Sequence, residues 1–206
     1  MLLLATASFA SSETVSRGSG ISADIASDGR VVIDLDGGIW VVPPQGGSAQ
    51  PIAIGPGAAR HPRWSPDASS IAFEAVADGR TDIRVYDVQA GQFRSLGDRG
   101  TAGLFPAWHP DGERIVFSSA RLGSGLDLWE IDLATGLQWR LSDRSGDETE
   151  AAWTSDGRNL VYIHRTANQW SLILRRHGEP EETLLVAAEP LAAPSWRPDG
   201  SLITVL

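Results

Sequence analysis

A short motif returns along the whole chain, and its aspartates lie 39, 44, 45 and 43 residues apart. It joins a tryptophan to a turn sequence of Pro, Asp and Gly. A period of about 40 to 45 residues is typical of an array in which one supersecondary unit recurs, as in a β-propeller. The motif residues are Trp64, Pro66, Asp67, then Trp108, Pro110, Asp111, Gly112, then Trp153, Asp156, Gly157, and finally Trp196, Pro198, Asp199, Gly200, with a weaker first copy at 25–29.

Each repeat predicts four strands. The strand that ends on the motif Trp is followed by an aliphatic run such as 71–73, then by a second run such as 82–88 and a last one such as 93–96, with Gly-rich and Asp-rich turns between them. Four antiparallel strands per repeat make one propeller blade. Sustained helical periodicity is absent from the sequence. We therefore expect an all-β propeller with about four complete blades and part of a fifth, forming an incomplete ring.

The motif has a structural explanation that we favour over a catalytic one. Pro presets φ, Asp hydrogen-bonds to its own backbone, and Gly accepts a positive φ, so the sequence predicts a tight turn. The Trp before it is expected to fill the wedge between adjacent blades. Ala68 stands where other copies have Gly, and this departure predicts strain or a reshaped turn.

The stretches 62–67, 106–112 and 194–200 share the pattern Pro-x-Trp-x-Pro-Asp, which continues into Gly in the last two. This pattern resembles the WD40-like, TolB-type β-propeller repeat family, and the resemblance covers residues 21–206. Ala151 and Ser155 replace both prolines in the fourth copy. The resemblance implies a propeller of the bacterial envelope. Members of the family bind protein partners, or precede the catalytic domains of peptidases and periplasmic amidohydrolases.

Charge and hydropathy narrow the choice of partners. The formal net charge is −9, so the phosphates of a nucleic acid would be repelled. The sequence has no apolar stretch long enough to span a membrane. Residues 1–20 begin with an apolar, small-residue segment that ends in an Ala-x-Ala-like site at 8–10, which favours the remnant of an export signal over a plain tail. We therefore expect a periplasmic or secreted protein, with residues 13–17 as a candidate closing strand.

The C-terminal residues 201–206 read as the second strand of the fifth blade. Because the TolB-type propeller that the repeat resembles has more blades, we expect the sequence to be truncated. The remaining blades or a catalytic domain are expected beyond Leu206.

The search for chemistry in the sequence is negative. It contains neither a Gly-x-Ser-x-Gly elbow nor a His-Glu-x-x-His motif, and no cysteine, so we predict no catalytic residue, no cofactor and no metal site within this chain. The segment 34–38 resembles the start of a calcium loop but fits a hairpin turn better. The four histidines, at 61, 109, 164 and 177, are read as scattered residues in preference to a channel cluster.

One acidic group is a candidate binding site. Asp143, Asp147, Glu148 and Glu150 are expected in the crossover between two blades, at the mouth of the central channel. A cation or a basic peptide would bind there, and the alternative is a solvated acidic loop. Two functions remain open. The first is a binding or substrate-gating module at the start of a larger, amidohydrolase-like periplasmic hydrolase. The second is a stand-alone, TolB-type interaction propeller whose face takes a protein partner.

Overall fold

The computed structural model describes residues 21–97, 102–121, 125–197 and 201–205, and within these ranges every helix or strand is a β-strand. Eighteen strands form four four-stranded antiparallel sheets and one two-stranded sheet. The strands are β1 (Ala23–Ile25), β2 (Val31–Leu35), β3 (Gly38–Val42), β4 (Gln50–Pro51), β5 (Ala58–Trp64), β6 (Ser70–Ala77), β7 (Arg80–Asp87), β8 (Gln92–Ser95), β9 (Leu104–Trp108), β10 (Arg114–Ser119), β11 (Asp127–Asp132), β12 (Gln138–Arg140), β13 (Asp147–Trp153), β14 (Asn159–Thr166), β15 (Gln169–Arg176), β16 (Glu182–Ala187), β17 (Ala192–Trp196) and β18 (Leu202–Val205).

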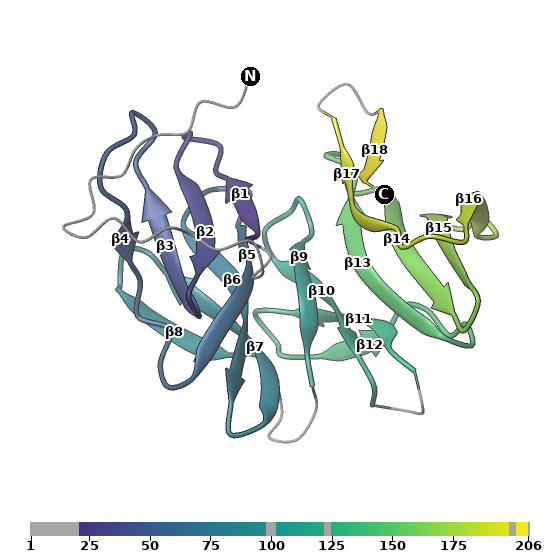
Figure 1. Cartoon of the computed structure of the whole chain (residues 1–206), viewed down its shortest axis with the longest axis horizontal. Helices are drawn as coiled ribbons and strands as arrows, with labels where there is room; N and C mark the ends of the chain where they lie inside the picture. The colour runs from purple at the N-terminus through teal and green to yellow at the C-terminus, as the bar shows by residue number, and fades with distance from the viewer. Residues whose placement is uncertain (1–20, 98–101, 122–124, 198–200, 206) are drawn as a thin grey trace.

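Each sheet pairs its strands in chain order, so every repeat is one meander, and we number these sheets as blades 1 to 5. The blades follow one another around an arc in Figure 1, with the first strand of each blade toward the centre. Every first strand contacts the first strand of the next blade, from β1 to β17. Among the described residues β1 and β17 do not touch, so the ring is not closed. The predicted fold class of four full blades and part of a fifth is confirmed.

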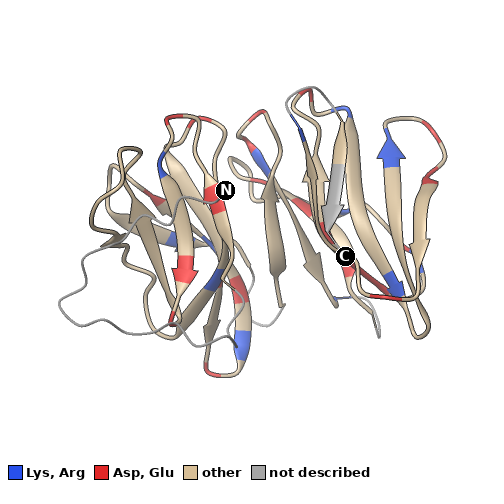
Figure 2. Ribbon diagram, turned by 45° about the horizontal axis from the view of Figure 1, so that its top comes forward, with Lys and Arg blue, Asp and Glu red and all other residues tan. Residues whose placement is uncertain are grey.

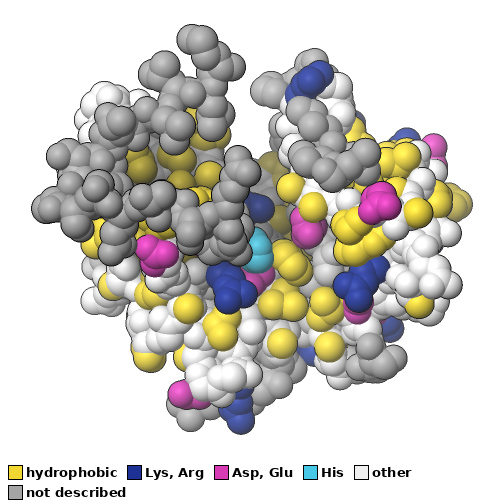
Figure 3. Space-filling model, viewed as in Figure 1, with side chains coloured by type: hydrophobic (Ala, Val, Ile, Leu, Met, Phe, Trp, Pro, Cys, Tyr) yellow, Lys and Arg dark blue, Asp and Glu magenta, His cyan; other side chains and the backbone are white. Residues whose placement is uncertain are grey.

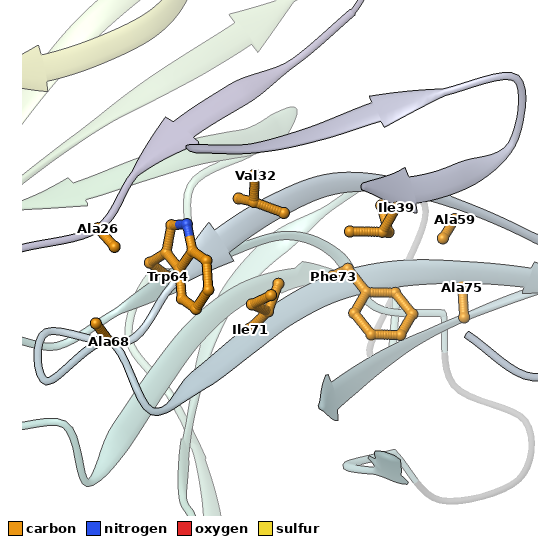
Figure 4. Close-up of a cluster of buried hydrophobic side chains, with 9 residues drawn as sticks. All are labelled: Ala26, Val32, Ile39, Ala59, Trp64, Ala68, Ile71, Phe73 and Ala75. Carbon is orange, nitrogen blue, oxygen red and sulfur yellow. The ribbon is translucent and has the colours of Figure 1, made fainter. Parts of the chain in front are cut away.

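The core lies between blades, because each inner blade is covered on both faces. The second strand of blade 2 is the clearest case: from Ile71 to Ala75 it is buried without interruption, as expected for a strand packed on both sides. One interblade cluster joins blade 1 to blade 2 and is drawn in Figure 4. Its nine buried residues are Ala26, Val32, Ile39, Ala59, Trp64, Ala68, Ile71, Phe73 and Ala75. Burying Phe73 completely stabilises the fold by about 2–3 kcal/mol.

The second strands of the four complete blades are more buried than the outermost strands. The outermost strand β8 is exposed along its length, and β16 leaves Leu184, Leu185 and Val186 exposed. The inner strands end at Ile25, Trp64, Trp108, Trp153 and Trp196, where the repeat predicts their ends. Residues 1–20, including the candidate closing strand at 13–17, lie outside the described residues, as do Pro198, Asp199 and Gly200.

Candidate functional site

In blades 2 to 4 the motif aspartates hold the turn between the first and second strands. Asp67 Oδ1 accepts hydrogen bonds from the Ser65 hydroxyl at 2.6 Å and from the Ser69 N–H at 3.0 Å. Asp156 repeats the pattern with the Thr154 hydroxyl and the Arg158 N–H. These bonds stabilise the carboxylate and hold the pKa of Asp67 and of Asp156 below the usual range.

The residue after the motif aspartate has a positive φ in each described turn. Gly112 and Gly157 have φ of 74° and 68°, and Ala68 adopts 59° at the same place. The turn in blade 2 thus keeps the shape of the others, and its alanine bears the cost of a left-handed backbone, about 1–2 kcal/mol. Of the two outcomes predicted for Ala68, backbone strain is found and a reshaped turn is not.

The motif tryptophans lie at the blade junctions. Trp64 is buried, with the Arg30 guanidinium of blade 1 4.4 Å from its ring centroid. Trp108, Trp153 and Trp196 are only half-buried. The indole N–H of Trp108 donates to the Arg63 carbonyl at 3.0 Å, and Trp196 makes the matching bond to the preceding blade. Trp108 and Trp196 are thus each bonded to the preceding blade, whereas the indole N–H groups of Trp64 and Trp153 have no partner among the described residues.

A feature that the sequence did not reveal recurs on the inner strands of blades 2 to 5. Three residues before the motif Trp, the backbone turns left-handed without a glycine: φ is 50° at His61, 52° at Phe105, 53° at Glu150 and 49° at Ala193. The register against the second strand shifts at this place in blades 2 to 5. The repeated β-bulge re-aims the inner strand next to the central cavity.

Carboxylates from the preceding strands hold these bulges. Asp34 Oδ2 accepts the His61 N–H at 2.8 Å, and Glu74 Oε1 accepts the Phe105 N–H at 2.6 Å. Both acceptors are buried on the second strand of the blade before. Glu150 Oε2 does the same for the Ala193 N–H at 2.6 Å, from the inner strand of blade 4. Asp34 is thus a cross-blade acceptor on β2, while the expected hairpin turn falls at Asp36 and Gly37.

The inner strands enclose a cavity of about 820 Å³. Residues from all five blades line it, including all four motif tryptophans and the bulge residues Phe105, Glu150 and Ala193. Four charged side chains face it: Asp24, Arg63, Glu150 and Arg197. Burial raises the pKa of Asp24, although the Trp64 N–H donates to its carboxylate at 2.7 Å. Figure 3 shows a hollow between the two sides of the arc, with charged and apolar side chains on its floor.

The structure does not bring the four candidate acidic residues together. Asp143 is exposed in the crossover, whereas the other three lie on β13 itself. Asp147 accepts the Leu126 N–H at 3.1 Å. Glu148 is fully buried beside the Ser142 hydroxyl, and burial raises its pKa. Of the four, only Glu150 lines the cavity, because successive strand residues point to opposite faces and the bulge turns its side chain inward.

The histidines also stay apart. His61 Nδ1 lies 2.8 Å from Glu74 Oε1, and His109 Nδ1 lies 2.8 Å from Asp111 Oδ2 at another junction. Within the described ranges, no three His, Cys, Asp or Glu side chains are grouped to hold a metal ion. Acidic and basic residues are interspersed along the ribbon of the blades in Figure 2. The described part of the chain offers no helix of the length and hydrophobicity that crossing a bilayer requires.

Meanders of four antiparallel strands, repeated around a central cavity and joined by motif tryptophans, define this chain as a β-propeller. The PD40 family model, described as the TolB beta propeller domain, matches residues 36–205. The chain therefore belongs to the TolB beta-propeller (PD40) family.

Two curated relatives extend the comparison. The Tol-Pal system protein TolB of Gluconobacter oxydans is 29% identical over 85 residues, which are 41% of this chain and 18% of that protein. The uncharacterised peptidase YuxL of Bacillus subtilis is 26% identical over 163 residues, which are 79% of this chain and 24% of the peptidase. The chain thus spans less than a quarter of either relative.

Solved structures share the fold. A putative TolB from Agrobacterium tumefaciens superposes with a TM-score of 0.76 at 22% identity, covering 87% of this chain and 71% of that one. TolB from Acinetobacter baumannii gives 0.73 at 20% identity, covering 88% and 47%. The tricorn protease gives 0.61 at 14% identity, covering 92% and 20%.

Proposed function

We propose that this propeller is a non-catalytic binding or substrate-gating module at the start of a larger exported hydrolase, located in the periplasm or outside the cell. Its central cavity takes a segment of a protein partner or a peptide-like substrate. The observation that carries the proposal is the cavity itself, where a constant repeat presents side chains that differ from blade to blade. Binding residues commonly lie on irregular segments that a rigid scaffold positions, and the repeated bulges fit that description.

The charges in the cavity support a peptide as the occupant. Arg63 and Arg197 offer guanidinium donors, Asp24 and Glu150 offer carboxylates, and aromatic surface lies between them. A peptide presents amides, both signs of charge and apolar side chains, so it can pair with each of these groups.

Two comparisons favour different settings for the module. The match to the peptidase YuxL covers most of this chain, which supports an association with a hydrolase, although that relative is titled a peptidase and not an amidohydrolase. The match to TolB of Gluconobacter oxydans supports the second candidate, a stand-alone interaction propeller of the cell envelope. In both settings this chain contributes binding and no catalytic group.

The binding proposal is tested by dialysing the chain against a library of short synthetic peptides and identifying the retained peptides by mass spectrometry. We expect Arg63→Ala to lose the peptides that the wild type retains. Arg80→Ala removes the same charge from the exposed end of β7 and should retain them. If the wild type retains no peptide, or if both variants lose the same peptides, the cavity is not the binding site.

An antibody against this chain distinguishes the two settings. We expect it to detect, in the exported fraction of the source cells, a polypeptide well above the 22.0 kDa of this chain. Immunoprecipitation of that polypeptide should bring down hydrolase activity. A band at the mass of the chain itself, without turnover, would favour the stand-alone propeller.

A further inference from the structure

The groove between blades 3 and 4 differs from the equivalent place in the other blades. Strand pairing aligns Val41, Val85, Glu130 and Leu174, which face Val32, Ala72, Val116 and Val161 across the second and third strands. Three of these four aligned residues are aliphatic. Blade 3 alone among the four places a carboxylate there, and Glu130 is only 2% exposed.

Two neighbours of Glu130 are ionisable as well. Blade 4 closes its turn with a neutral bond from the Asn159 N–H to the Thr154 hydroxyl, and blade 2 uses Ser70 and Ser65. Blade 3 has Arg114 and His109 at these positions. Arg114 Nη2 donates to Asp111 Oδ2 at 2.7 Å, and its Nη1 lies 3.4 Å from Glu130 Oε2. Blade 1 also has an arginine, Arg30, at the place of Arg114, so Glu130 and His109 are the ionisable residues that replace neutral ones.

Glu130 is incompletely paired. Its Oε2 has the Arg114 contact, but its Oε1 accepts no hydrogen bond from any described residue, although the atom is buried. A buried acceptor without a donor costs about 1–3 kcal/mol. A valine like that of blade 2 would avoid this cost, so the carboxylate is a stability loss that the fold of the blade does not require.

Glu130 lies in the wall of a cavity of about 840 Å³ that runs along the groove. Trp139, Leu141 and Trp153 supply apolar surface, and Trp139 is 38% exposed. Among the described residues, five arginines line the cavity and only two carboxylates do, Glu130 and Glu179, in a chain whose net charge is −9. The lining arginines are Arg114, Arg140, Arg158, Arg175 and Arg176.

The arginines differ in their availability. Arg140 is paired with Asp127 at 2.6 Å, and Arg176 with Glu182 at 2.8 Å. Each guanidinium has five N–H donors, so one carboxylate leaves donors free. Arg158 is exposed, and its guanidinium forms no hydrogen bond or close ion pair with a described residue. The groove thus offers donors for acidic oxygens at its rim and one unpaired acceptor in its wall.

We propose that this groove binds an acidic, extended peptide segment of a protein partner, separately from the central cavity. Carboxylates of the segment bind the guanidinium groups at the rim, and Arg158 is the guanidinium most available to bind one of them. When Arg114 moves aside, a hydrogen-bond donor of the segment reaches Glu130 Oε1 and donates to it. The edge strand beside the groove favours a peptide as the ligand, because β12 is the outermost strand of blade 3 and carries Trp139 and Arg140 along the groove. An extended segment can pair with such an edge.

The test is fluorescence anisotropy with the full chain and a labelled peptide of alternating Asp and Ala residues. We expect Arg158→Ala to weaken binding about fivefold to tenfold, with Arg80→Ala unchanged, and added salt to weaken it further. Glu130→Val restores the residue type of the other blades. It should raise the melting temperature and still weaken binding, a combination that a merely structural Glu130 does not produce.

Other outcomes would overturn the inference. Unchanged affinity in both Arg158→Ala and Glu130→Val would remove the groove as the site. Equal binding of a peptide with Asn in place of Asp would refute charge recognition. Binding of oligogalacturonate without binding of the peptide would assign the groove to an acidic saccharide. Loss of binding in Arg63→Ala but not in Arg158→Ala would place the peptide in the central cavity, which would leave the proposed function intact.

Discussion

The contact between Gly157 and His109 predicts how much one added methyl group at a blade junction destabilises the fold. Gly157 has φ of 68°, and a Cβ there would lie 2.7 Å from His109 Nε2 and 2.8 Å from His109 Cε1. Gly136 has φ of 73° and nothing within 4 Å of the same atom. Alanine at either position therefore bears the same backbone strain, and only Gly157→Ala adds a steric clash across the junction.

The magnitudes follow from these two terms. An alanine in the left-handed conformation destabilises the folded state by about 1–2 kcal/mol. The same substitution makes the unfolded chain less flexible, which stabilises the protein by about 0.4–1 kcal/mol. We expect Gly136→Ala to destabilise by about 0.5–1 kcal/mol. Overpacking adds about 1–3 kcal/mol, so Gly157→Ala should cost about 2–4 kcal/mol. The ring cannot move away cheaply, because His109 is 8% exposed, bonded to Asp111 and packed edge-on against Trp153 at 4.7 Å.

Urea unfolding followed by tryptophan fluorescence measures both variants. In a His109→Ala background the clash disappears, so the cost of Gly157→Ala should fall to that of Gly136→Ala. Equal destabilisation of the two single variants, within about 0.5 kcal/mol, would refute the reasoning about the junction.

Three further substitutions test other parts of the structure. Ala68→Gly should change the free energy of unfolding by less than about 1 kcal/mol. The relief of left-handed strain is offset by a more flexible unfolded chain and by the loss of a buried methyl group. A change above about 2 kcal/mol in urea unfolding would contradict this balance. Trp108→Ala should cost about 3–5 kcal/mol by the same assay, and Trp108→Phe, which loses the bond to Arg63 but keeps an aromatic ring, clearly less. For Glu148 the folded pKa is raised by burial, so its contribution to stability is present below the unfolded value near 4.5 and is lost as pH rises through the folded pKa. Glu148→Gln should therefore gain stability relative to the wild type as the pH rises above the unfolded value, and a constant difference would argue against the raised pKa.

The strand order was readable in the sequence because each blade repeats the same local signals. The Trp at the end of an inner strand and the Asp that bonds to its own turn recur with the same spacing, and both act within a few residues. The structure confirms the inner strands ending at Trp64, Trp108, Trp153 and Trp196. The hairpin at Asp36 and Gly37 was likewise favoured by local chemistry.

The features around the cavity were not readable, since they depend on contacts between blades. A left-handed His61 or Phe105 carries no local signal, and proline following each of them would argue against that backbone. The bulge is stabilised by a carboxylate from the preceding blade, about 30 residues away in sequence. Glu148 and Glu150 were grouped by their closeness in sequence, whereas the strand sends one into the core and the other to the cavity.

The repeated bulge separates the part of the scaffold that must stay fixed from the part that can vary. The preceding blade holds only the backbone N–H of Phe105 and of Ala193, so exchanging these two side chains leaves those two bonds in place. Glu150 is the exception, because its own carboxylate holds Ala193. A panel of propellers that differ only at positions 105 and 193, with β-branched residues avoided, would share one backbone and present many different cavities for the selection of new ligands.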